Sequence, residues 1–474
     1  MMAENSQNNE PKVAIVIPVY NRKPDLIRLL KSVFELEYGN FDVFVIDNGS
    51  ADGLEEINEL YPDVAILKNE HNYGATAGFN KGLLYAASNG EYKYIWMLDS
   101  DLIVDMDSLC VLVNVMEEDN GIGIAGPKIL NIHNKNLIVE VGANIDLNTA
   151  QVFPLYCNEP DFDTKELFEV DYVGSGISLL RIEAFKKTGT MDERYFFLWD
   201  DMDYGLWMKR NGYRVVAVPN ARVYHPPFTE KRSVGVNAYY GVRSMLLTVS
   251  KYRSKLSRVI SIYNVLRRVL KISSFRLLSG YPGIAKLNIY ALWDFCMNRW
   301  GESDRIGNYT QKDNINSTSD LAGDTIKKAL VLESGSFELA SEIIDSLKSL
   351  NENTEIFMLV QNYRKRMFET LPIDEFILYD DRRGNVMLRH LQIFFRLLFS
   401  GFDVAVNPDP QTGSPFTYAI RKVYEWDSPT RSFYKSSLNV FEIWKIPLSV
   451  LFGEILALIL LPLVYFASLK YEIK

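Results

Sequence analysis

Cysteine is scarce in this chain, whose 474 residues include only Cys110, Cys157 and Cys296. The three lie far apart and lack the short spacings of zinc-binding sequences, so neither a disulfide framework nor a structural zinc site is indicated. This usage is typical of proteins in a reducing, cytoplasmic compartment. The opening residues, MMAENSQNNE, contain no apolar run. We therefore expect no secretory signal there, and a disordered tail over residues 1–11.

Acidic residues are absent from a long internal stretch. Between Lys231 and Trp293 the sequence contains twelve Lys and Arg and no Asp or Glu, although the whole chain has a net charge of −9. Such a stretch can contact anionic lipid, bind nucleic acid, or form ordinary solvated helices. No nucleic-acid-binding motif accompanies it, and the acidic remainder would repel a polyanion. We therefore expect no nucleic-acid partner and interpret residues 231–305 as a basic helical region near a membrane.

Charge is nearly absent from residues 446–469, where Glu454 is the only charged residue between Lys445 and Lys470. An apolar segment of this length can span a bilayer. Glu454 and two prolines also suit a helix that lies on the membrane or is buried in protein. The sequence therefore predicts a membrane-associated or transmembrane segment over residues 440–474, with its mode of attachment open.

The first part of the chain alternates strand-like and helical segments. The apolar runs VAIVIP, FDVFVID, VAILKN and YKYIWMLD are separated by helical patterns such as DLIRLLKSVFEL. This alternation predicts a parallel sheet, whose ligands bind at the carboxyl ends of the strands. We place this α/β domain at residues 12–230. A polar linker over 306–325 and a smaller α/β module over 326–425 follow the basic region.

Two aspartates, Asp99 and Asp101, follow the last of these runs and are separated by Ser100. Neighbouring carboxylates repel each other unless a cation lies between them. Their oxygens suit Mg²⁺ or Mn²⁺, which commonly bridge a carboxylate to phosphate. A solvated turn is the alternative for the tripeptide alone, and its place after a predicted buried strand favours the metal site.

Loops after the first two strands are candidates for holding a nucleotide. Asp47 ends the second strand and could accept hydrogen bonds from a base or ribose, unless the loop is an ordinary turn in which Asp52 caps the next helix. The first loop contributes Pro18, Val19, Tyr20 and Asn21. A third candidate is HNYGATAGFNKG, with Asn72, Gly74, Gly78 and Asn80. Its glycines either admit an anion at a helix N-terminus or simply pack the helix on the sheet, and they do not form the dinucleotide-binding pattern.

Acidic residues are crowded again in WDDMDYGLWMKRNGY, at Asp200, Asp201 and Asp203. Three carboxylates so close together should raise at least one pKa, and such a group can accept a proton from an attacking hydroxyl. A helix N-terminus enriched in acids is the alternative. His225, one of four histidines, could complete the metal site begun by Asp101, although a lone histidine is more often structural.

Together these segments resemble the family 2 glycosyltransferases of the GT-A fold, especially the rhamnosyltransferase-like branch. The resemblance covers about residues 12–250 and is carried by VIPVYN, VIDNGS, NYGATAGFNKG, LDSD, GSGISLLRIEAF with MDERYFF, and WDDMDYGLWMKRNGY. It implies an inverting transfer of a sugar from a nucleotide-diphosphate donor. It also implies that Asp99 and Asp101 bind the metal on the diphosphate, with His225 as a further ligand. By the same resemblance, Asp201 is the general base, and the first loop and Asp47 hold the nucleotide.

The chain departs from the family at two places. The family usually has Glu-Asp where this sequence has Asp200-Asp201, which puts the supporting role of Asp200 in doubt. Processive members carry Gln-x-x-Arg-Trp, whereas CMNRW has Cys296 at the glutamine position, so a processive polymerase is not expected. The module at 326–425 faintly resembles the N-terminal half of a GT-B Rossmann domain of the heptosyltransferase type, and we interpret it as an accessory unit.

These observations lead to one expected function and two alternatives. We expect a glycosyltransferase at the cytoplasmic face of the cell membrane, acting on a lipid-linked or surface-glycan acceptor. A nucleotidyltransferase would need a glycine-rich loop after the first strand, which PVYNRKPD lacks. A membrane-tethered scaffold that binds a nucleotide-sugar without turnover is disfavoured by the presence of both Asp101 and Asp201.

Overall fold

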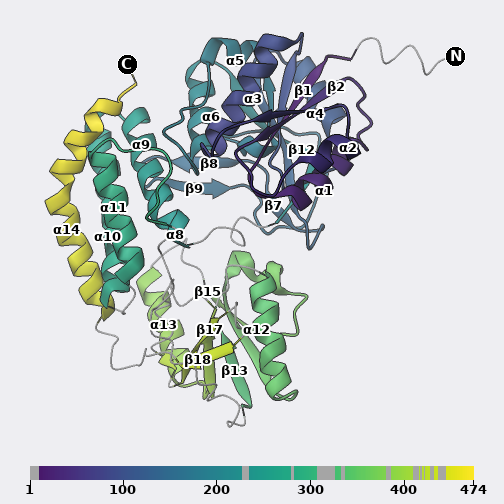
Figure 1. Cartoon of the computed structure of the whole chain (residues 1–474). Coiled ribbons are helices and arrows are strands. Elements are labelled where there is room, and N and C mark those ends of the chain that lie inside the picture. The colour runs from purple at the N-terminus through teal and green to yellow at the C-terminus, as the bar shows by residue number, and fades with distance from the viewer. Residues whose placement is uncertain are drawn as a thin grey trace.

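A computed structural model describes most of the chain (Figure 1). The described residues are 10–226, 234–278, 282–306, 326–332, 337–379, 386–408, 416, 419–420, 422–427, 432–435 and 445–473. The predicted linker at 306–325 lies almost wholly outside them, as does most of the predicted tail at 1–11.

The first domain is built on a sheet that has ten strands among the described residues, in the order β10-β12-β6-β11-β4-β1-β2-β3, with β5 beside β12 and β7 beside β6. The strands are β1 (Val13–Val19), β2 (Phe41–Asp47), β3 (Val64–Lys68), β4 (Tyr94–Met97), β5 (Ile103–Val104), β6 (Ile122–Asn131), β7 (Ile138–Glu140), β10 (Phe168–Glu169), β11 (Leu179–Arg181) and β12 (Arg214–His225). Strands β3, β2, β1 and β4 are parallel, as the sequence predicts. Strand β11 is antiparallel to both of its neighbours and joins this half to the parallel pair of β6 and β12.

Helices cover both faces of this sheet because alternate strand residues point to opposite sides. The helices are α1 (Lys23–Val33), α2 (Glu55–Leu60), α3 (Ala75–Asn89), α4 (Ser108–Glu118), α5 (Ile182–Thr188) and α6 (Asp200–Arg210). One core cluster joins Ile15 to Leu29 of α1 and Leu112 of α4. The other joins Val16 to Leu83 of α3. A separate hairpin consists of β8 (Ala143–Asp146) and β9 (Gln151–Pro154).

A helical layer packs beside the first domain (Figure 1). It contains α8 (Val234–Val236), the π-helical turn η3 (Asn237–Gly241), α9 (Val242–Tyr252), α10 (Lys255–Leu278), α11 (Pro282–Cys296), α14 (Lys445–Ser468) and η8 (Leu469–Tyr471). One hydrophobic cluster includes Tyr195 and Trp199 of the first domain, Leu266 of α10 and Val464 of α14. The basic helical region is therefore packed onto the first domain, and α14 is packed onto that region.

A second α/β unit follows, with strand order β15-β14-β13-β16-β17-β18. Its elements are β13 (Lys328–Val331), α12 (Phe337–Leu350), β14 (Glu355–Gln361), η5 (Asn362–Phe368), β15 (Glu375–Tyr379), α13 (Val386–Leu398), β16 (Val404–Asn407), β17 (Val423–Asp427) and β18 (Ser432–Lys435). All its strands run parallel except β18. The sheet continues beyond the predicted boundary at residue 425, because β18 pairs along β17.

Candidate active site

A cavity of about 590 Å³ opens at the carboxyl ends of the central strands. Its lining includes most of the candidate residues from the sequence: Pro18, Val19, Tyr20, Asn72, Gly74, Asp99, Ser100, Asp101, Asp200, Asp201 and His225. These residues come from segments as distant as β1 and the end of β12. The parallel strands bring them together because their carboxyl ends meet at one edge of the sheet.

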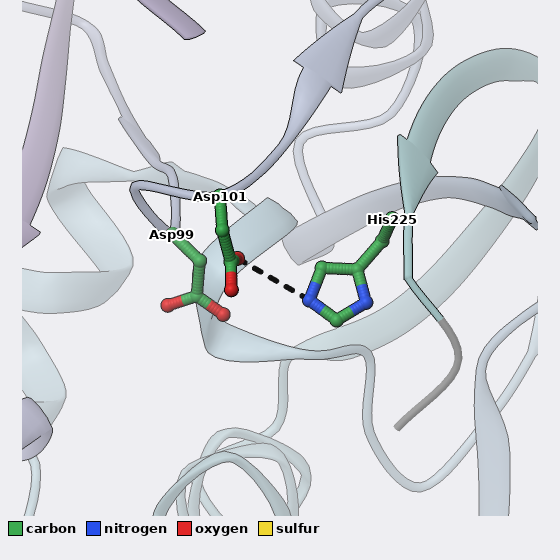
Figure 2. A group of neighbouring side chains, drawn as sticks. All are labelled: Asp99, Asp101 and His225. Atoms are coloured by element: carbon green, nitrogen blue, oxygen red, sulfur yellow. Dashed lines mark ion pairs between the residues drawn. The ribbon is translucent and has the colours of Figure 1, made fainter. Parts of the chain in front are cut away.

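Asp99, Asp101 and His225 lie together at this edge (Figure 2). One possible ligand atom from each lies within 4.8 Å of the other two. His225 Nε2 is 3.3 Å from one carboxylate oxygen of Asp101, and Arg22 Nη1 is 3.2 Å from the other. Two carboxylates and an imidazole are a donor set that a divalent cation accepts, so these residues fit the Mg²⁺ or Mn²⁺ expected from the sequence.

The position of Asp99 depends on a close backbone approach. The amide of Asp99 donates a hydrogen bond of 2.8 Å to the carbonyl of Gly176, in the short helix η2 (Ser175–Ile177). A Cβ atom at Gly176 would lie 2.0 Å from Cγ of Asp99. Glycine at this position therefore leaves room for the carboxylate. The segment GSGIS contributes to the family resemblance, but nothing in its sequence indicates the contact of Gly176 with Asp99.

Asn48 links the loops that are candidates for holding a nucleotide. Its side-chain amide donates to the Asn72 side chain at 2.9 Å and to the carbonyl of Gly74 at 3.0 Å, and its oxygen accepts from Asn69 at 2.9 Å. Its backbone amide donates to the carbonyl of Val19. Asn48 is 3% exposed and lines the cavity. Asn48 lies in the motif VIDNGS, but no local sequence signal distinguishes it from its neighbours.

Four candidate residues lie outside the cavity lining, namely Asn21, Asp47, Gly78 and Asn80. Asn21 accepts a hydrogen bond from the amide of Ala51, and Asp47 accepts one from the amide of Ser50. Asn80 is buried and exchanges hydrogen bonds with the backbone of Met191. Gly78 lies against Pro18, where a Cβ would come within 3.0 Å of the proline ring. These four contacts shape the loops around the cavity.

Asp52 caps α1, whereas the sequence suggested that it could cap the next helix, α2. Its carboxylate accepts a hydrogen bond of 2.9 Å from the amide of Lys23, the first residue of α1. Helix α2 begins after Leu54 without a side-chain cap. The second loop therefore stabilises the N-terminus of α1 across the cavity edge.

The acidic segment forms the first turn of α6. Leu198 and Trp199 both have positive φ angles, of 68° and 71°, which turn the chain sharply just before Asp200. Such conformations cost free energy in non-glycine residues and often occur at functional sites. Burial, followed by the negative charge of Asp201, raises the pKa of Asp200 to about 7. The expected rise of a pKa in this cluster falls on Asp200 and also on Asp203, because burial raises the pKa of Asp203 even though its carboxylate pairs with Lys251 at 2.6 Å.

The helical layer also reaches the cavity. Asn237 and Gly241 of the π-helical turn and Met245 of α9 line it. Glu140 and Tyr172 line it on the side of β7. None of these five residues was selected from the sequence, because no local motif marks them. Part of the cavity lining is therefore built by residues that only the tertiary structure brings together.

Comparison with known proteins agrees with this geometry. Residues 14–189 match the family described as glycosyl transferase family 2. Over the matched residues, the first domain is therefore a family 2 glycosyltransferase domain of the GT-A fold.

Each of the similar proteins matches only part of this chain. An uncharacterized glycosyltransferase of Rickettsia conorii is 32% identical over 148 residues, which cover 31% of this chain and 24% of the relative. A galactofuranosyltransferase of Mycolicibacterium smegmatis is 22% identical over 263 residues, covering 50% of this chain and 41% of the relative. A crystal structure of GalNAc-T7 with UDP, GalNAc and Mn²⁺ has a TM-score of 0.45 at 18% identity and covers 55% of this chain and 51% of that one. The chain thus spans less than half the length of these curated relatives.

Proposed function

We propose that this protein is an inverting, metal-dependent glycosyltransferase that moves a sugar from a nucleotide-diphosphate donor to a lipid-linked or surface-glycan acceptor. The observation that carries the proposal is that the Asp99, Asp101 and His225 group and the Asp200–Asp201 pair line one cavity. A metal ligand set and a carboxylate pair on the same cavity are what this transfer requires. The match of residues 14–189 to the family supports it.

The residues divide into two roles. A divalent cation, when bound, would stabilise the negative charge that develops on the departing diphosphate. Asp99, Asp101 and His225 would hold that cation, and Arg22, in contact with Asp101, adds positive charge at the same edge. Asp201 would accept the proton of the acceptor hydroxyl as it attacks the sugar carbon. The raised pKa of Asp200 keeps that neighbour partly neutral at pH 7, which lessens repulsion within the pair.

The donor, acceptor and location remain part of the proposal. We take a deoxysugar donor of the rhamnose type as the first to test, because the motifs resemble that branch. The relative from Mycolicibacterium smegmatis is named a galactofuranosyltransferase, so furanose donors come next. We place the protein at the cytoplasmic face of the cell membrane, where nucleotide-sugars are available.

Thermal-shift measurements with a panel of nucleotide-sugars test the donor and the metal together. One donor should stabilise the wild-type protein strongly in Mn²⁺ and weakly in EDTA, because ligand binding to the folded state raises its stability. Asp101→Ala should lose the Mn²⁺-dependent part of the shift. Asp63→Ala, an exposed carboxylate of the same domain, is the matched control and should behave as wild type.

Three outcomes would contradict the proposal. Equal donor-induced shifts in Mn²⁺ and EDTA would exclude the metal role. Stabilisation by a nucleoside triphosphate with a sugar phosphate, but by no nucleotide-sugar, would favour a nucleotidyltransferase. Donor binding with no sugar transfer in membrane extracts that supply acceptor would favour a non-catalytic scaffold.

A further inference from the structure

Helix α14 presents an unusually apolar surface. Among the described residues, the segment Pro447–Tyr471 is the one helix long and apolar enough to cross a membrane, and only 17% of its most apolar stretch is buried. Large apolar side chains at least 39% exposed follow one another along it: Val450, Leu451, Phe452, Ile455, Leu456, Leu458, Ile459, Leu463 and Phe466. Soluble proteins rarely expose so continuous an apolar surface, which indicates an interaction site.

The C-terminal end of this helix is attached to the rest of the protein. The Tyr471 hydroxyl donates to the carbonyl of Phe295 at 3.1 Å and contacts the Asn298 side chain at 2.9 Å. The guanidinium of Arg194, in the GT-A domain, lies 5.4 Å from the centre of the Tyr471 ring. Tyr471 itself is 5% exposed. The end of the chain is therefore held on the same side as the catalytic domain.

The middle of α14 is attached along α10. Cβ at Gly453 would lie 2.7 Å from the backbone of Lys271, so the two helices touch closely there. Glu454 accepts a hydrogen bond of 2.6 Å from Tyr263 and lies 3.5 Å from Arg267. The one carboxylate of α14 is thus satisfied by its neighbour and not presented to the apolar surface.

These contacts indicate whether α14 crosses a membrane or lies on its surface. Figure 1 shows α14 running beside α10 for most of its length. Helix α10 carries Arg267, Arg268 and Lys271 in the part that lies beside α14, and Arg267 and Lys271 are exposed. If α14 crossed a bilayer in this arrangement, these cations would have to enter the hydrocarbon region, where charged groups are strongly disfavoured. A crossing helix would also separate its two ends by the bilayer, whereas Tyr471 after it contacts Arg194 of the GT-A domain and the second α/β unit before it packs on Leu137 of the same domain.

We propose that α14 lies in the plane of an anionic membrane surface without crossing it. Its exposed apolar side chains enter the acyl-chain boundary, while Arg267, Lys271 and Lys470, which are exposed beside it, contact anionic headgroups. The bilayer is the occupant because the surface combines an apolar face with a basic border, and because Tyr471, just beyond the C-terminal end of α14, packs against the GT-A domain. This inference deepens the proposed location and does not depend on the identity of the donor.

The lipid partner is tested by co-sedimentation of the full-length protein with vesicles. Binding to vesicles that contain phosphatidylglycerol should exceed binding to pure phosphatidylcholine by roughly tenfold or more at low salt. Ile459→Glu with Leu463→Glu should reduce binding by roughly tenfold or more, because two charges enter the apolar face. Leu60→Glu, at an apolar residue 52% exposed on α2, is the control and should bind as wild type.

The in-plane arrangement is tested by cysteine labelling in inside-out membrane vesicles. The background cysteines are replaced by serine, and a single cysteine is introduced at Ile473 or, as the reference, at the exposed Glu91 of the catalytic domain. A membrane-impermeant maleimide should label both equally without detergent. Labelling of Ile473→Cys only after detergent would show a spanning helix and overturn the proposal.

Two further results would also overturn it. One is failure of the wild type to bind any vesicle. The other is a concentration-dependent dimer that the Ile459→Glu, Leu463→Glu variant abolishes, which would assign the face to a second copy of the chain. Donor-induced stabilisation is measured on the same variants. If it persists while lipid binding fails, the proposed glycosyltransferase function stands and only this inference is lost.

Discussion

At the scale of single residues, Asp99 and Asp101 are positioned by close contacts with Gly176 and Arg22. Asp99 and Asp101 were selected because two carboxylates follow a buried strand, and that reasoning needs only the sequence. The neighbours that hold them, Gly176 and Arg22, are distant in the chain or carry no distinctive spacing. The local sequence is therefore enough to identify candidate metal ligands, whereas the residues that pack against them can be identified only from the tertiary structure.

Gly176→Ala should weaken metal-dependent donor binding. The added methyl group would occupy the position of the Asp99 carboxylate, so either Asp99 or η2 must move. We expect the Mn²⁺-dependent thermal shift by donor to fall by at least half, with the shift in EDTA unchanged. Gly174→Ala is the matched control, because its Cβ would meet nothing closer than Ile177 at 3.6 Å. Equal behaviour of the two variants would contradict the assigned role of Gly176.

Asp201→Asn should remove catalysis and keep donor binding. The amide is nearly isosteric with the carboxylate but cannot accept the proton of the acceptor hydroxyl. Transfer should fall by roughly 10²–10⁴, while the dissociation constant of the donor stays within a few-fold. Asp200→Asn should cost less, because we assign Asp200 only a role in tuning charge. The measurement is single-turnover transfer alongside equilibrium donor binding, and near-normal turnover by Asp201→Asn would remove it as the base.

At the scale of elements, the regular parts of the GT-A domain were predictable and the junctions were not. The runs ending in Pro18, Asp47 and Asp99 do form adjacent parallel strands, because buried parallel strands have continuous apolar sequences. Strand β11 is antiparallel and was not foreseen, since its short run LLR has no local signal for direction. The helical spacing of apolar residues predicted α1, and the same residues form its buried face.

The basic helical region shows where charge counting fails. The sequence suggested a cationic surface between residues 231 and 293, yet Arg243, Lys251, Arg258 and Arg276 are all at most 9% exposed. Lys251 of α9 lies between Asp192 and Asp203, at 2.9 and 2.6 Å. Lys251 thus joins the helical layer to α6 of the GT-A domain, which contains Asp203. Only the remaining exposed cations are available to a membrane.

This junction should make stability sensitive to acid. Burial alone would raise the pKa of Asp192, but the hydrogen bond from Arg194 and the charge of Lys251 outweigh it and hold the pKa at about 2. Because this is below the ordinary value of 3.8, the paired carboxylate contributes stability that is present above pH 4 and lost as the pH falls toward 2. The contribution is about 2.5 kcal/mol at neutral pH. Asp192→Asn should therefore lower Tm at pH 7 and approach the wild-type Tm near pH 2, whereas a constant difference across this range would contradict the pairing.

At the scale of the whole molecule, the helical layer and the second α/β unit both pack against the GT-A domain. The cluster around Tyr195 and Trp199 includes side chains of α10, α11 and α14, so the acidic helix, the basic helices and the C-terminal helix share one core. Leu137 of the GT-A domain belongs to the core of the second α/β unit, beside an ion pair between Glu159 and Arg366. The sequence predicted each unit from its own periodicity. It could not predict these contacts, because they join residues separated by hundreds of positions.

Leu137→Asp should detach the second α/β unit without destroying the donor site. Leu137 is 5% exposed and packs with that unit's buried residues, so a carboxylate there would be buried without a counterion or would force the surfaces apart. We expect the calorimetric transition of the second unit to lose more than about 3 kcal/mol of stability. Leu137→Met, which keeps the volume, should cost less than about 1.5 kcal/mol. The Mn²⁺-dependent thermal shift by donor should persist in both variants, since Leu137 does not line the cavity. An unchanged transition in Leu137→Asp would mean that the two α/β units are not joined through this residue.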